Sequence, residues 1–189
     1  GNIRNEIDRY LRENNPDIIV LGRLKSKHFN TAENRIINFV LSVFKGTVLI
    51  VSHDKGLEPG MKIGIGSLNC SEAVFNASFT EELFLNTNSV LKSFNILESS
   101  NVVPQTVGSL GRKTINYVFD NNENTVNNLP VYLSISNIDL LFLDGGNKEK
   151  EALSRLLNTY NMVRKSDINI LVTGEKHTQY NFNTTLKIA

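Results

Sequence analysis

Short apolar runs recur along the chain and are separated by longer stretches of mixed polarity. Most of these runs are continuously apolar rather than alternating, which is typical of parallel strands that are covered on both faces. Flanking polar, Gly and Pro residues bound the runs at lengths that suit strands. We predict β-strands near 17–22, 47–52, 61–66, 89–97, 114–119, 139–143 and 168–173.

Between most of the runs, apolar residues recur every three or four positions. Leu153, Leu156 and Tyr160 do so before the last predicted strand, with charged and polar residues between them, and indicate an amphipathic helix. We also expect helices over 3–14, over about 31–44, after Asn69 and over 125–136. Alternating strands and helices predict an α/β fold, a twisted parallel sheet with helices on both faces.

One stretch of the sequence occurs twice. YLRENNPDIIVLG (10–22) and YLSISNIDLLFLD (132–144) have apolar residues at matching positions, and each is followed by a helical pattern and a further apolar run. The spacing suits a strand, helix and strand crossover. We therefore predict two tandem units, a truncated one over 1–56 and a fuller one with a C-terminal tail over 57–189. The identical pairs are Tyr10/Tyr132, Leu11/Leu133, Asn15/Asn137, Asp17/Asp139 and Leu21/Leu143.

The first copy begins in the middle of a unit. The chain also starts at Gly1 instead of a methionine, and we interpret it as a fragment of a longer protein. A sheet made from the two strands of the first unit alone would leave an exposed hydrophobic edge. We expect a homodimer partner, the second unit or the remainder of the larger protein to cover that edge.

Composition narrows the class of partner. The chain has 189 residues, of which 40% are hydrophobic, and its net charge of +1 argues against a nucleic-acid partner. The single Cys70 cannot form an internal disulfide, which favours a cytoplasmic location. No run reaches the roughly 18 apolar residues of a membrane span. We expect no membrane contact by this fragment itself.

The residues RENNPDIIVLG…TVLIVS and SISNIDLLFLD…INILVT resemble the closing part of a universal stress protein domain. MKIGIGSLNCSEAVFNA resembles its opening strand and first helix. The resemblance covers 2–54 as a truncated copy and 61–174 as a fuller one. It implies an α/β fold, and it extends to stress-protein-like tails of larger proteins such as cation–proton antiporters. A missing N-terminal region would then tether the chain to the inner membrane.

The sequence departs from the pattern that the resemblance implies for ATP binding. Such members carry an acidic residue at the end of the first strand and a glycine-rich phosphate loop after the fourth. A backbone phosphate cradle needs several glycines, and neither copy supplies the full set. Three strand-to-helix loops nevertheless hold the candidate ligand-binding or anion-binding residues: Gly22, Arg23 and Lys25; Gly66, Ser67 and Asn69; and Gly145, Gly146 and Asn147.

The sequence evidence for other kinds of site is weaker. Gly64 and Gly66 lack the third glycine of a dinucleotide-binding fingerprint and fit a tight strand-to-helix turn. Asp144 stands where a response-regulator receiver keeps its phosphoacceptor, but the acidic pair such a receiver needs is missing. The basic loop around Arg23 fits either an anion site or a solvated loop. The histidines show no metal-ligand spacing, and no catalytic residues are predicted.

We therefore predict a non-catalytic regulatory domain that senses a ligand or binds a partner, and that is a cytoplasmic part of a larger protein. The alternative is a universal stress protein that binds ATP or AMP. No cofactor is assigned, and a nucleotide would be the ligand only under the alternative.

Overall fold

The computed structural model describes residues 2–23, 31–53, 55, 56, 58, 61–67, 91–97, 114–120, 128–145, 150–164 and 166–178. The helices in this part of the chain are α1 (Ile3–Asn14), α2 (Thr31–Val43), α5 (Leu129–Ile135), α6 (Lys150–Val163) and α7 (Glu175–Thr178). The strands are β1 (Ile18–Gly22), β2 (Thr47–Val51), β3 (Ile63–Ser67), β4 (Leu91–Leu97), β5 (Thr114–Asp120), β6 (Leu140–Asp144) and β7 (Asn169–Thr173).

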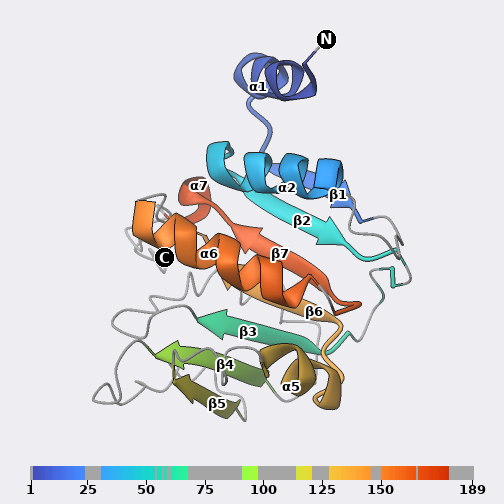
Figure 1. Ribbon diagram of the computed structural model, residues 1–189, viewed down its shortest axis with the longest axis vertical. Helices are drawn as coiled ribbons and strands as arrows, with labels where there is room; N and C mark the ends of the chain where they lie inside the picture. Colours follow the sequence, from blue (N-terminus) through green and yellow to red (C-terminus); the bar gives the residue numbers. More distant parts are fainter. Residues whose placement is uncertain are drawn as a thin grey trace, which may run out of the picture.

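The strands form one seven-stranded sheet in the order β1-β2-β7-β6-β3-β4-β5. All neighbours are parallel except β2 and β7, which run antiparallel. The arrowheads of β2 and β7 accordingly point in opposite directions in Figure 1. The α/β class is confirmed, and each predicted strand lies within two residues of an observed one. The expected helix after Asn69 lies outside the described residues.

The two copies of the repeated stretch share two backbone features. Asn15 and Asn137 both have left-handed backbone conformations, with φ of 41° and 50°. Asn15 follows the end of α1, and Asn137 follows the end of α5. Asparagine tolerates this region better than most residues. The carbonyl of Asp17 accepts a hydrogen bond from the amide of Thr47 at 2.9 Å, and the carbonyl of Asp139 accepts one from Asn169 at 2.9 Å.

The antiparallel junction is symmetric with respect to the repeat. The first residue of β1 pairs with the first of β2, and the first of β6 pairs with the first of β7. The third residues of β2 and β7, Leu49 and Leu171, are therefore equivalent. They also face each other at the centre of the β2–β7 pair. The two halves of the sheet consequently meet about a local two-fold axis beside these leucines.

The main core lies on one face of the sheet. Helices α2, α6 and α5 lie on the viewer's side in Figure 1, and their buried side chains join those of β2, β6 and β7. A smaller cluster on the other face includes Ile63, Ile65, Leu140, Phe142 and Leu171. Burial of these side chains supplies the main favourable contribution to folding.

Helix α1 is attached differently. None of its residues is buried, although Ile7 and Leu11 pack partly against the main core. The guanidinium of Arg4 lies 5.6 Å from the ring centroid of Phe39 on α2.

By contrast, Leu129 and Leu133 of α5 are buried, and Tyr132 contacts the rings of Tyr117 and Phe119. The domain boundary near residue 56 stays a prediction, because one sheet contains strands from both sides of it.

No helix within the described ranges is long and apolar enough to span a bilayer.

Candidate functional site

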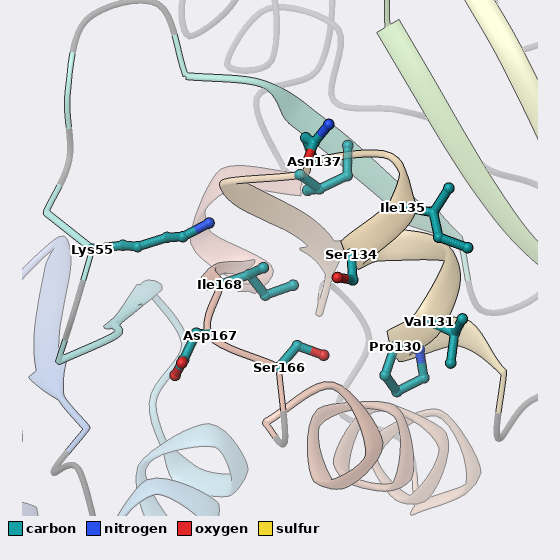
Figure 2. A pocket seen from close by; sticks show the side chains of 10 residues that line it. Lys55, Pro130, Val131, Ser134, Ile135, Asn137, Ser166, Asp167 and Ile168 are labelled. Carbon is teal, nitrogen blue, oxygen red and sulfur yellow. The ribbon is translucent and has the colours of Figure 1, made fainter.

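A cleft of about 490 Å³ lies between α5 and the turn that joins α6 to β7. Pro130 and Ser134 line it from α5, and Ser166 and Ile168 line it from the turn. Lys55, from the segment that follows β2, closes a third side (Figure 2). The cleft therefore brings together residues from both sides of the predicted domain boundary.

Some polar groups around the cleft have hydrogen-bond or ion-pair partners among the described residues, and others do not. The ammonium of Lys55 contacts the Oδ1 atom of Asp139 at 3.3 Å, and the amide of Lys62 donates to Oδ2 of the same carboxylate at 3.0 Å. The hydroxyl groups of Ser134 and Ser166 are turned toward the space between the helix and the turn, whereas the carboxylate of Asp167 is turned away (Figure 2). The Oγ atom of Ser166 is buried and has no hydrogen-bond partner among the described residues.

A similar lysine contact occurs at the other copy of the repeat. Lys176, which follows β7, donates to the carbonyls of Asn15 and Pro16 at 3.3 and 3.0 Å. Its ammonium lies 4.0 Å from Asp17. Each repeated turn therefore receives a lysine from the segment that leaves the central strand of the other half. The two contacts differ in detail: Lys55 pairs with the carboxylate of Asp139, whereas Lys176 is held mainly by Asn15 and Pro16.

Of the residues predicted as ligand-binding, Arg23 is the best defined. Its guanidinium donates to the carbonyls of Arg164 at 2.9 Å, of Ser166 at 3.2 Å and of Ile168. These carbonyls lie at the C-terminal end of α6 and in the turn that follows, where a helix leaves acceptors without intrahelical partners. Burial lowers the pKa of Arg23 below its ordinary value, but an arginine remains protonated at any working pH. Arg23 thus joins β1 to the far half of the sheet.

Tyr160 of α6 lies close to this arginine. Its side chain is fully buried, and within the described ranges its hydroxyl has no hydrogen-bond partner. Burial raises the pKa of Tyr160 to about 12, an effect that the nearby charges of Arg23 and Arg164 partly oppose. The phenol is therefore neutral at physiological pH.

Close packing constrains two of the predicted glycines, Gly145 more strictly because its neighbour is a backbone carbonyl. A Cβ atom on Gly66 would lie 2.6 Å from a methyl carbon of Leu143, and one on Gly145 would lie 2.4 Å from the carbonyl oxygen of Thr173. Both contacts are shorter than van der Waals separation. Gly22 differs, since a Cβ atom there would meet nothing within 4 Å.

The structure does not bring the predicted residues to one place. Because β2 and β7 are antiparallel, the carboxyl ends of β1 and β6 point in opposite directions. Gly22 and Arg23 therefore lie at one end of the strands, and Gly66, Ser67 and Gly145 lie at the other end. The remaining candidates fall outside the described residues, and their binding role stays a prediction: Lys25, Asn69, Gly146 and Asn147. No group of three His, Cys, Asp or Glu side chains within the described ranges is placed to hold a metal ion.

Sequence reasoning missed Lys55, Ser166 and the partners of Arg23. The contacts of Lys55 and Arg23 join residues more than 80 positions apart, so no local pattern reveals them. The sequence offered one signal, the recurrence of Asn15 and Asp17 as Asn137 and Asp139. In the structure both asparagines are left-handed.

Comparison with known proteins identifies the architecture. No family model and no curated protein matches the sequence. Among solved structures, the crystal structure of a universal stress protein from Archaeoglobus fulgidus superposes with a TM-score of 0.66 at 15% sequence identity. The chain has a fold like that of a universal stress protein. The match covers 92% of this chain and 66% of the archaeal one. At this level of identity the similarity establishes the fold alone.

Proposed function

We propose that this chain is a non-catalytic regulatory domain made of two tandem universal-stress-protein-like units, the first of them truncated. In this proposal it is a soluble, cytoplasmic part of a larger protein such as a cation–proton antiporter. The observation that carries it is the use of Arg23, the only charged candidate site residue that the structure describes. Its guanidinium binds three carbonyls of the other half of the sheet instead of facing solvent.

The position of the cleft supports a sensing role. Lys55 comes from the segment leaving β2, while Ser134 and Ser166 belong to the second half of the chain. An occupant of the cleft would contact both halves at the place where the Lys55–Asp139 pair joins them. If the two halves of the sheet shift relative to each other, the contacts of such an occupant change. The occupant would then bind one arrangement of the halves more tightly than the other, and this difference in affinity would favour the arrangement it binds better.

The alternative function is nucleotide binding at the opposite edge of the sheet. Gly145 follows β6 directly and precedes the connection to α6, and ligands of open α/β sheets bind at the carboxyl ends of such strands. The packing of Gly145 against the Thr173 carbonyl accounts for this glycine without a ligand. Because packing alone explains this glycine, nucleotide binding is the second candidate function.

Calorimetric titration separates the two functions. ATP, AMP and a cyclic dinucleotide are each titrated into the purified chain. We expect no binding at micromolar concentrations of any of them. Micromolar binding of any of the three would replace the regulatory proposal with the alternative.

The sensing role is tested separately by filling the cleft. Ser134→Trp places a large side chain at its wall, and Ser154→Trp provides a control at an exposed position of α6. In the full-length gene product we expect Ser134→Trp alone to change the activity of the attached region. Equal activities of both variants and the unmodified protein would reject the cleft as a sensor.

A further inference from the structure

A buried amide side chain stands at the start of the central strand β7. Asn169 is the first residue of this strand, precedes the apolar run ILV, and is fully buried. Burying an amide costs free energy unless its polar atoms have hydrogen-bond partners. Both ends of this amide have one. Its Oδ1 atom accepts from the backbone amide of Ser52 at 2.8 Å, and its Nδ2 atom donates to the carbonyl of Gly56 at 3.3 Å.

These two hydrogen bonds lie just beyond the backbone pairing of β2 with β7. On this side the pairing ends where Ile50 is opposite Ile170, and Asn169 is the next residue of β7. The segment that leaves β2 is therefore held by the side chain of Asn169 at two points. Lys55, which lines the cleft, lies between these points in the sequence.

Asn169 also contacts the ion-pair partner of Lys55. Its backbone amide donates to the carbonyl of Asp139 at 2.9 Å, and the carboxylate of Asp139 lies 3.3 Å from the ammonium of Lys55. The Lys55 and Asp139 side chains are 44% and 33% exposed, and exposed pairs contribute little to stability. The buried amide of Asn169 is therefore a stronger hold on the segment than the ion pair.

We propose that Asn169 is the positioning residue of the cleft. Its amide fixes the segment that leaves β2, so that the side chain of Lys55 extends toward the space between α5 and the turn before β7 (Figure 2). The consequence for sensing rests on the proposed function, whereas the positioning is a property of this chain alone.

The first copy of the repeat has a threonine at the equivalent position. Thr47 is the first residue of β2, is fully buried like Asn169, and donates its backbone amide to the carbonyl of the repeated aspartate, Asp17. A threonine side chain has a single hydroxyl and lacks the separate acceptor and donor of an amide. A threonine therefore fits the buried start of a strand in this fold, and the amide is a feature of the second copy.

Asn169→Thr, which places the residue of the first copy at the equivalent position of the second, tests the proposal by nuclear magnetic resonance of the labelled chain. Amide exchange at Ser52 should quicken by roughly tenfold more than exchange at Leu141 in the centre of β6, because the Ser52 amide loses its acceptor. The order parameter of the Lys55 backbone amide should fall from about 0.85 to below about 0.6. Exchange at Leu141 measures any loss of global stability. Equal changes at Ser52 and Leu141 would reduce Asn169 to a contributor to global stability and overturn the proposal.

Lys55→Met is the matched control, because it removes the ion pair and keeps the amide of Asn169. Exchange at Ser52 should then stay as slow as in the wild type. If Lys55→Met frees Ser52 as much as Asn169→Thr does, the ion pair holds the segment and the proposal fails. Should Asn169→Thr not fold, the wild-type chain decides: nuclear Overhauser effects should join the side-chain amide protons of Asn169 to Gly56, and their absence would overturn the positioning role.

The activity of the full-length gene product separates positioning from sensing. Asn169→Thr and Lys55→Met should change the activity of the attached region by the same factor, and the double variant should change it no further. If all three activities equal that of the wild type while Ser52 exchanges quickly in Asn169→Thr, sensing by the cleft is rejected and the positioning role is upheld.

Discussion

Replacing Arg23 by methionine should destabilise the whole sheet. The guanidinium links the end of β1 to three carbonyls at the end of α6 and in the turn before β7. Methionine keeps a similar apolar stem but donates no hydrogen bond. The carbonyls of Arg164, Ser166 and Ile168 then lose a charged donor in a partly buried place, and water has only limited access to them.

The expected magnitude follows from these contacts. A hydrogen bond to a charged group contributes about 1.5–3 kcal/mol net, but the buried guanidinium also carries a desolvation cost that methionine avoids. We therefore expect a loss of roughly 2–4 kcal/mol in the free energy of unfolding, less than the sum of three separate bonds. For a chain of this length that corresponds to a fall in Tm of roughly 5–15 °C. Arg23→Lys should recover only part of the loss, since an ammonium lacks the planar fork of donors.

Urea denaturation followed by circular dichroism measures the difference. Arg12→Met is the control, because the Arg12–Asp8 pair lies on the exposed face of α1, and exposed pairs contribute about 0–1 kcal/mol. A stability of Arg23→Met within about 0.5 kcal/mol of the wild type, the usual range for surface substitutions, would contradict the structural role given to Arg23.

Three further predictions concern the glycines, Tyr160 and Lys176. Gly145→Ala should cost about 1–3 kcal/mol of stability through overpacking against the Thr173 carbonyl, while Gly22→Ala, which meets no atom within 4 Å, should change it little; equal urea midpoints for the two variants would refute this. The pKa of Tyr160 is raised to about 12 in the folded chain from an ordinary value of 10. Its contribution is therefore complete below pH 10 and is lost as the pH rises to 12, so wild type should lose about 2–3 kcal/mol relative to Tyr160→Phe across that range; parallel stability curves would exclude the shift. Lys176→Met should speed amide exchange in the turn around Asn15 and Pro16, which its ammonium contacts, whereas Lys45→Met, whose ammonium is paired with Glu175 at an exposed position, should not.

The strands were predictable because each is a compact apolar run with polar boundaries. The run of β7, for example, is buried at every position, as a central strand of a covered sheet should be. The helix around Pro130 was also anticipated in part, and it begins so that this proline falls in its first turn. Local periodicity was sufficient for these elements because their burial pattern follows from the strand or helix alone.

The junction between the halves was not predictable in the same way. Nothing in TVLIV or NILVT indicates whether the two strands pair in parallel or antiparallel. The direction of β2 relative to β7 decides where the candidate residues lie, and it places Arg23 and Gly145 at opposite ends of the strands. The partners of Arg23 are backbone carbonyls, which carry no sequence signal. An exposed basic loop and a buried bridge therefore have the same appearance in the sequence.

The β2–β7 junction underlies both the fold and the proposed function, and nuclear Overhauser effects between backbone protons test it directly. In the isotopically labelled chain, cross-strand contacts should join Leu49 to Leu171, with Val48 to Val172 and Ile50 to Ile170 on either side. That set of contacts would establish an antiparallel junction centred on equivalent residues of the repeat. Contacts displaced by a residue, or a β2 strand that shows contacts to β1 alone, would contradict it.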